Sequence, residues 1–151
     1  MSIEPSHLTS HLGYWLRYVS NHVSQAFARK LEDRDVTVAE WVMLRELYDV
    51  ETIAPSRLSE QMGMTRGAIT KLADRLITKA LITRDANPAD ARAQTLKLTP
   101  AGRKLVPELS TLADRNDAEF FGHLSPDERQ SLERALNDIV SRRGLTSIPL
   151  S

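Results

Sequence analysis

The chain has 151 residues, 41% of them hydrophobic, with 20 basic side chains balanced by 20 acidic ones. This length allows one domain with a substantial buried core. The absence of cysteine excludes disulfides, a thiolate nucleophile and control by cysteine oxidation. The sequence lacks the apolar run that export or membrane insertion requires, so we expect a cytoplasmic protein without membrane contact.

The neutral total conceals an uneven distribution of charge. Residues 51–104 contain 10 lysines and arginines against 5 acidic residues, whereas residues 1–50 and 105–151 are both acidic. The local field governs attraction to a polyanion, and the basic middle segment therefore indicates a nucleic-acid-binding region.

The first expected element is a long amphipathic helix. Apolar residues recur at spacings of three, four and seven from Leu8 to Leu31, which predicts about six helical turns. A stripe of this length needs a cover from the same chain or from a partner. His7 and His11 have a spacing that suits a metal site, but no third ligand is near, which favours two surface histidines over a metal site.

A second helix is expected at about residues 38–49. Thr37 and Glu40 have the spacing of a capping box, and apolar residues follow at helical spacing. Trp41 lies on this apolar stripe, and we expect it in the core. The segment 51–54 can then form a short strand against a later hairpin.

Residues 55–81 predict a helix, a tight turn and a second helix. Pro55 suits a helix start, Gly63 interrupts the apolar pattern, and Thr65 can cap the helix that follows. The face of this second helix opposite its apolar stripe is small and polar, and it is basic near its start. Such a face suits a recognition helix that enters the DNA major groove.

A β-hairpin follows the second of these helices. The runs 81–84 and 94–98 read as two short strands, and the segment 85–93 between them predicts a long tip. Thr99 and Pro100 then supply a cap and a first residue for another helix. A helix-turn-helix followed by a hairpin is a winged helix.

Two amphipathic helices complete the chain. The first extends to about residue 121 and contains Pro107, which we expect to bend it. Ser125 and Glu128 form a capping box for the last helix, which ends before Gly144. Its apolar stripe is formed by Leu132, Leu136, Ile139 and Val140.

Five segments of the sequence resemble the MarR family of bacterial transcription regulators. They are residues 58–63, 71–76, 81–84, 90–92 and 96–102. The most specific part is the Asp-x-Arg pattern of the wing followed by Leu-Thr-x-x-Gly. Many family members have a second arginine in the wing where this chain has Ala91, which leaves one fewer cation for DNA.

The resemblance implies a mainly α-helical fold with a small β-hairpin wing (α+β), in which terminal dimerisation helices carry a winged helix-turn-helix lobe. The lobe is expected at residues 35–104 and the helical dimerisation region at 1–34 and 105–151, as one intertwined domain overall. The implied function is a homodimeric transcription regulator, expected to be a repressor. It would bind a pseudo-palindromic operator in double-stranded DNA and respond to a small molecule.

The resemblance also implies which residues act. The recognition helix would meet the major groove, Arg92 would enter the flanking minor groove, and Asp90 would hold the wing tip by pairing with an arginine. The full DNA-binding set is Thr65, Arg66, Gly67, Thr70, Lys71, Arg75, Arg84, Asp90 and Arg92. Family members often bind small aromatic anions between the dimer helices and the lobe. The candidate ligand residues here are Trp15, Arg17, Tyr18, Trp41 and Arg45.

Two other classes of function compete with this one. An enzyme is disfavoured, because the sequence shows no nucleophile with an adjacent base, no metal cluster and no glycine-rich phosphate loop, and we expect no cofactor. The alternative is a winged helix that contacts only proteins. A DNA shift assay separates this class, since such a module would bind DNA weakly and without sequence preference.

Overall fold

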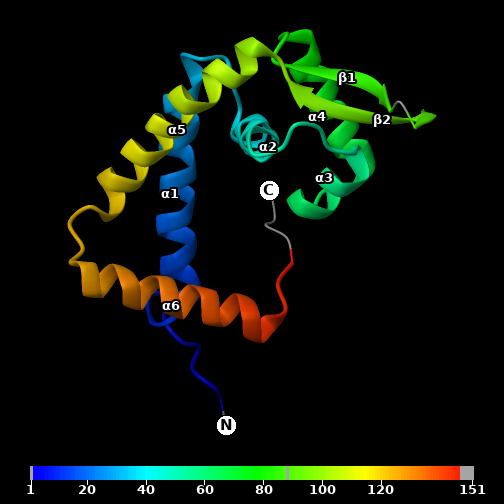
Figure 1. The fold of residues 1–151 in the computed structure, drawn as a ribbon. Helices are drawn as coiled ribbons and strands as arrows, with labels where there is room; N and C mark the ends of the chain where they lie inside the picture. The colour runs from blue at the N-terminus through cyan, green and yellow to red at the C-terminus, as the bar shows by residue number, and fades with distance from the viewer. Residues whose placement is uncertain (1, 88, 147–151) are drawn as a thin grey trace.

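The computed structural model describes residues 2–87 and 89–146, which form helices and one two-stranded hairpin (Figure 1). This confirms the predicted fold class. A short 3-10 turn, η1 (Leu8–Ser10), precedes the main elements. These are α1 (Leu12–Glu32), α2 (Val38–Tyr48), α3 (Pro55–Met62), α4 (Arg66–Thr78), β1 (Ile82–Asn87), β2 (Asp90–Leu98), α5 (Pro100–Phe121) and α6 (Pro126–Arg143). None of the described helices combines the length and apolar character needed to span a bilayer.

The helix starts follow the predicted caps. The Thr37 N–H donates to Glu40 Oε1 at 2.8 Å, and the Glu40 N–H donates to Thr37 Oγ1 at 3.1 Å, which completes the capping box of α2. Ser125 and Glu128 form the same reciprocal pair at the start of α6. These caps satisfy orphan N–H groups that the helix itself leaves unpaired.

The first helix begins later than predicted, at Leu12 instead of Leu8. His11 has extended backbone angles, φ −97° and ψ 124°, which separate η1 from α1. His7 and His11 therefore flank the 3-10 turn and do not share the face of one α-helix. Among the described residues, no three or more histidine, cysteine or acidic side chains gather as a metal site would require.

The hairpin is longer than predicted, and the expected long tip is wrong. The antiparallel register runs from Ile82 opposite Leu98 to Asn87 opposite Asp90, with one register shift between Ala86 and Asn87. Backbone pairing does not require alternating apolar residues when a two-stranded ribbon stands in solvent, so the polar sequence continues the ladder. The strand expected at 51–54 is a single bridge between Ile53 and Leu96.

One hydrophobic core lies among α2, α3, α4 and the hairpin, which we call the lobe, and extends into the inner ends of α1 and α5. Leu31 of α1, together with Val106 and Leu109 of α5, is buried with the lobe residues. The other core members are Val36, Met43, Leu44, Leu47, Ile53, Leu58, Met62, Ile69, Leu72, Ala73, Leu76, Ile82, Leu96 and Leu98. The lobe is therefore packed directly onto the helices that carry it, with no linker between them.

The far ends of the carrying helices leave their apolar faces uncovered. In Figure 1, α1 and α5 lie side by side and α6 crosses near the end of α1 distant from the lobe. Leu12 is 80% exposed and Ile139 is 48% exposed, and no residue of α6 is buried. An open groove of about 810 Å³ lies between α1, the end of α5 and α6. A single chain thus leaves a large apolar surface in water.

A buried polar contact joins α1 to α5. Asn116 of α5 is only 4% exposed, and its Nδ2 donates to the carbonyl of Val23 at 3.1 Å. Lys30 donates to Asn116 Oδ1 at 3.0 Å and to Glu119 Oε2 at 2.7 Å. Buried polar groups are costly unless satisfied, so these bonds favour one arrangement of the two helices over others.

Candidate nucleic-acid interface

The turn between α3 and α4 has the geometry that the sequence predicts. Gly63 adopts left-handed angles, φ 63° and ψ 31°, which glycine accepts without strain. The Met64 N–H donates to the Ser59 carbonyl at 3.1 Å, and Thr65 Oγ1 then accepts from the Ala68 N–H at 3.1 Å. The turn ends α3 and starts α4 within three residues, which fixes α4 against the lobe.

The two faces of α4 divide as predicted. Ile69, Leu72 and Leu76 are fully or almost fully buried, together with Ala73. The opposite face is exposed over Arg66, Gly67, Thr70, Lys71, Asp74, Arg75 and Thr78. A methyl group added at Gly67 would meet no atom within 4 Å, so the helix surface is open to close approach there. The Thr70 hydroxyl donates to the Arg66 carbonyl at 2.9 Å and retains its capacity to accept.

Three basic side chains of α4 form no ion pair within the described part of the chain. Among the described residues, no acidic side chain forms an ion pair with Arg66, Lys71 or Arg75. Their charge is therefore available to a ligand outside the chain. Side chains of this kind bind phosphates and base edges.

The base of the wing is held firmly to the lobe. Leu96 is fully buried, and its backbone exchanges hydrogen bonds with Ile53 at 2.8 and 3.0 Å. The Thr99 hydroxyl donates to the Ala80 carbonyl at 2.8 Å. Gly102 packs so closely that an added Cβ would lie 2.1 Å from the carbonyl oxygen of Leu81. The wing thus projects from a fixed base.

The backbone of β2 places Asp90 and Arg92 in the outer part of the hairpin. Their side chains lie outside what the structure describes. The expected pairing of Asp90 with an arginine, and the insertion of Arg92 into a minor groove, stay predictions.

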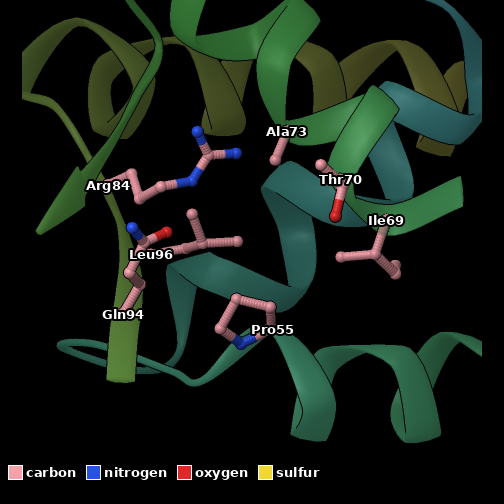
Figure 2. A pocket seen from close by; sticks show the side chains of 7 residues that line it. All are labelled: Pro55, Ile69, Thr70, Ala73, Arg84, Gln94 and Leu96. Carbon is pink, nitrogen blue, oxygen red and sulfur yellow. The ribbon is translucent and has the colours of Figure 1, made fainter. Parts of the chain in front are cut away.

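Arg84, expected among the DNA contacts, has an acidic partner within the lobe. Its Nη2 donates to Asp74 Oδ1 of α4 at 2.7 Å. Figure 2 shows the Arg84 side chain reaching from the wing toward α4, at a pocket of about 220 Å³ that Pro55, Thr70 and other residues line. The sequence carries no signal for this pair, because the two residues belong to different elements joined by a turn.

Comparison with known proteins gives the family of the chain. The sequence model described as the MarR family matches residues 36–93. A putative transcriptional regulatory protein for the hcr operon from Thauera aromatica is 30% identical over 126 residues, which cover 83% of this chain and 76% of that protein. The chain belongs to the MarR family.

Solved structures of MarR-family proteins share the fold. A mutant MarR from Escherichia coli complexed with operator DNA matches with a TM-score of 0.78 and 27% identity, over 85% of this chain and 93% of that one. BpsR of Bordetella bronchiseptica, whose DNA binding is regulated by 6-hydroxynicotinic acid, matches with a TM-score of 0.79 and 26% identity. The match covers 90% of this chain and 97% of that one. This MarR-family chain is therefore a DNA-binding transcription regulator, as predicted, and the relatives are regulators and not enzymes.

In this MarR-family chain, a buried ion pair ties the C-terminal end of α4 to α2. Glu40 is 1% exposed, and Lys79 Nζ lies 3.0 Å from Glu40 Oε2 and donates to Oε1 at 3.1 Å. Burial raises the pKa of the Glu40 carboxyl, but hydrogen bonds from Thr37 and the charge of Lys79 outweigh it and hold the pKa below its usual value. The spacing of the capping box predicts the bonds between Glu40 and Thr37. The sequence gives no signal for the pair that Glu40 forms with Lys79, 39 positions away.

The five candidate ligand residues fall into two separate groups within one MarR-family chain. Trp15 and Tyr18 belong to a row of rings on α1, next to Arg17. Trp41 packs edge-on against Phe27 with ring centroids 6.2 Å apart, and Arg45 pairs with Asp49 on α2. Twelve helical positions separate Trp15 from Phe27, which is about 18 Å along the axis of α1. One chain alone therefore does not assemble the expected cleft.

Proposed function

We propose that this chain is a homodimeric repressor that binds a pseudo-palindromic operator in double-stranded DNA and is released by a small aromatic anion. The observation that carries the proposal is the exposed face of α4, where three cations that pair with no acidic side chain in the described part of the chain stand beside a firmly based wing. The similarity to a MarR structure complexed with operator DNA supports it. Since an operator lies with the chromosome, a cytoplasmic location follows from the proposal.

The uncovered apolar helices support the dimer. We assign residues 1–34 and 105–151 to dimerisation and residues 35–104 to the DNA-binding lobe, with two chains intertwined as one domain. Leu132 and Leu136 of α6 are 39% and 41% exposed in one chain, and a second copy would remove them from water. Two lobes on such a base suit half-sites in successive major grooves, about 34 Å apart.

The residues divide between two kinds of DNA contact. Thr65, Arg66 and Gly67 lie at the start of α4, where a recognition helix enters the major groove, and Thr70, Lys71 and Arg75 continue the same face. In the wing, Asp90 shapes the tip and Arg92 enters the flanking minor groove. Repression needs nothing more than occupancy of the operator, and the described elements all belong to the lobe or to its helical base.

The effector is proposed from chemistry and from one relative. The two groups of candidate residues pair aromatic rings with arginines, which suits a small aromatic carboxylate. They can meet if Trp15, Arg17 and Tyr18 of one protomer face Trp41 and Arg45 of the other. A ligand there would change the angle between lobe and base, and hence the distance between the two recognition helices. The regulation of BpsR by 6-hydroxynicotinic acid supports this class of ligand.

Lys71→Ala and Arg92→Ala should weaken operator binding in different ways. A genome-wide footprint supplies the operator, and titration of labelled duplexes measures the affinity. Lys71→Ala should cost about 1–3 kcal/mol if a base edge is read. Arg92→Ala should weaken binding most for operators with A·T-rich flanks, because their minor groove is narrow and negative. The central sequence preference should be unchanged.

Parent protein and variants must be folded dimers for this comparison. If Arg92→Ala binds every flank variant as tightly as the parent, the wing assignment is wrong. If the parent itself binds DNA weakly and without sequence preference, the winged helix is a protein-interaction module instead.

Small aromatic carboxylates at millimolar or lower concentration should reduce operator affinity. The reason is that a ligand shifts the equilibrium by its preference for the form that does not fit the operator. Titration of the protein–operator complex with a panel of hydroxylated benzoic and nicotinic acids measures the effect, and aliphatic acids of equal charge are the matched control. An operator affinity unchanged across the whole panel would remove the proposed effector class.

A further inference from the structure

An acidic residue stands on the face of α4 that is proposed to meet DNA. Asp74 is exposed and lies three positions after Lys71 and four after Thr70, so it shares their face of the helix. A carboxylate at this place repels the phosphates of an approaching duplex. Left alone, it would oppose the binding that its neighbours provide.

Arg84 neutralises this carboxylate. The 2.7 Å bond joins the guanidinium to Oδ1, and the side chain of Arg84 is 29% exposed while that of Asp74 is 57% exposed. Among the described residues, Arg84 is the one side chain that forms an ion pair with Asp74. Lys97 of β2 forms an ion pair with Asp85, at 3.6 Å. The arginine is therefore committed to a partner inside the lobe.

The wing base sets where Arg84 stands. Arg84 is paired in the hairpin register with Leu96, the fully buried residue whose backbone is bonded to Ile53. In Figure 2 its side chain extends from β1 toward α4, near Thr70 and Ala73. The pair thus links the fixed part of the wing to the recognition helix.

Resting on the proposed function, we infer that Arg84 is a positioning residue for operator binding and not itself a contact to phosphate or base. It acts through Asp74, whose charge it cancels on the face of α4 proposed to meet DNA. This revises the expectation from the sequence, which placed Arg84 among the DNA contacts. Exposed ion pairs contribute little to folding, so the main effect of this one falls on DNA affinity.

A double-mutant cycle tests the assignment. Operator affinity and its salt dependence are measured by fluorescence anisotropy for the parent, Arg84→Gln, Asp74→Asn and the double variant Asp74→Asn/Arg84→Gln. Arg84→Gln should weaken binding on the order of tenfold, because each protomer then presents an uncompensated carboxylate to the duplex. Asp74→Asn should bind at least as tightly as the parent. The double variant should recover most of the affinity and keep the salt slope of the parent.

A direct DNA contact by Arg84 predicts the opposite pattern. The double variant would then be as weak as Arg84→Gln, and the salt slope would fall by about 0.9 for each phosphate that the protein no longer neutralises; that result overturns the inference. Lys71→Ala serves as the control, since it should lower affinity whether Asp74 is present or replaced. Thermal melts and size-exclusion chromatography verify the folded dimer. Arg84→Lys, which keeps a cation beside Asp74, should bind within a few-fold of the parent. If the parent itself does not bind its operator, the proposed function is wrong. That outcome is distinct from a failure of the inference about Arg84, which requires a parent that binds.

Discussion

Replacing Lys79 with methionine should lower the free energy of unfolding by about 3 kcal/mol at neutral pH, because it leaves the buried Glu40 carboxylate without its cation. Chemical denaturation followed by circular dichroism measures this change. Glu40→Gln in the same background is the control, since it removes the stranded charge and should restore part of the stability. A Lys79→Met variant as stable as the parent would show that Glu40 does not depend on this ion pair.

The pH dependence of the pair has a definite sign. The folded pKa of Glu40 lies below its ordinary value of 4.5, so the folded state binds fewer protons than the unfolded state near that pH. The stabilisation is therefore fully present above pH 4.5 and is lost as the pH falls through the folded pKa. Lys79→Met removes the hydrogen bond and the charge of Lys79, both of which lower the pKa of Glu40, so this pKa is higher in the variant than in the parent. The stability gap between parent and variant should accordingly narrow in acid.

Replacing Leu132 and Leu136 together with glutamate should dissociate the proposed dimer at micromolar concentration. Both side chains lie on the exposed apolar stripe of α6, where a partner would have to bury the new charges. Operator affinity should fall by about a hundredfold or more, because each lobe then binds its half-site without the other. Sedimentation velocity and operator titration measure the two effects.

Gln130→Glu with Ser141→Glu is the matched control for the dimer. These changes add the same charge to the opposite face of α6 and should leave the association intact. A leucine variant that still sediments as a dimer with parent-like operator affinity would place the dimer contact elsewhere.

The sequence predicts the local part of this fold well. Caps such as Thr37 with Glu40 depend on a spacing of three residues, and Gly63 marks its turn by its own backbone freedom, so both are readable without the structure. The exposed face of α4 follows from helical periodicity alone. For the same reason the residues on the face of α4 opposite its apolar stripe are predicted correctly as exposed.

Contacts between distant elements are not readable in this way. Neither Arg84 with Asp74 nor Lys79 with Glu40 has a spacing that predicts it, because each pair forms only when separate elements pack together. The hairpin exceeds its predicted length since backbone pairing tolerates a polar sequence. The candidate ligand cleft depends on residues that one chain keeps apart.

The hydrogen bonds of Asn116 with Val23 and Lys30 fix the position of α1 along α5. An entirely apolar contact between two helices can shift by one turn, about 5.4 Å, with small change in the area it buries. Here a shift of one turn would leave the buried side-chain amide of Asn116 without its hydrogen-bond partners, so a shift of α1 along α5 is unfavourable. A dimer whose lobes are held in this way should tolerate little variation in the distance between operator half-sites. Inserting a single base pair between the half-sites should therefore weaken operator binding more than it would if α1 and α5 could slide along each other.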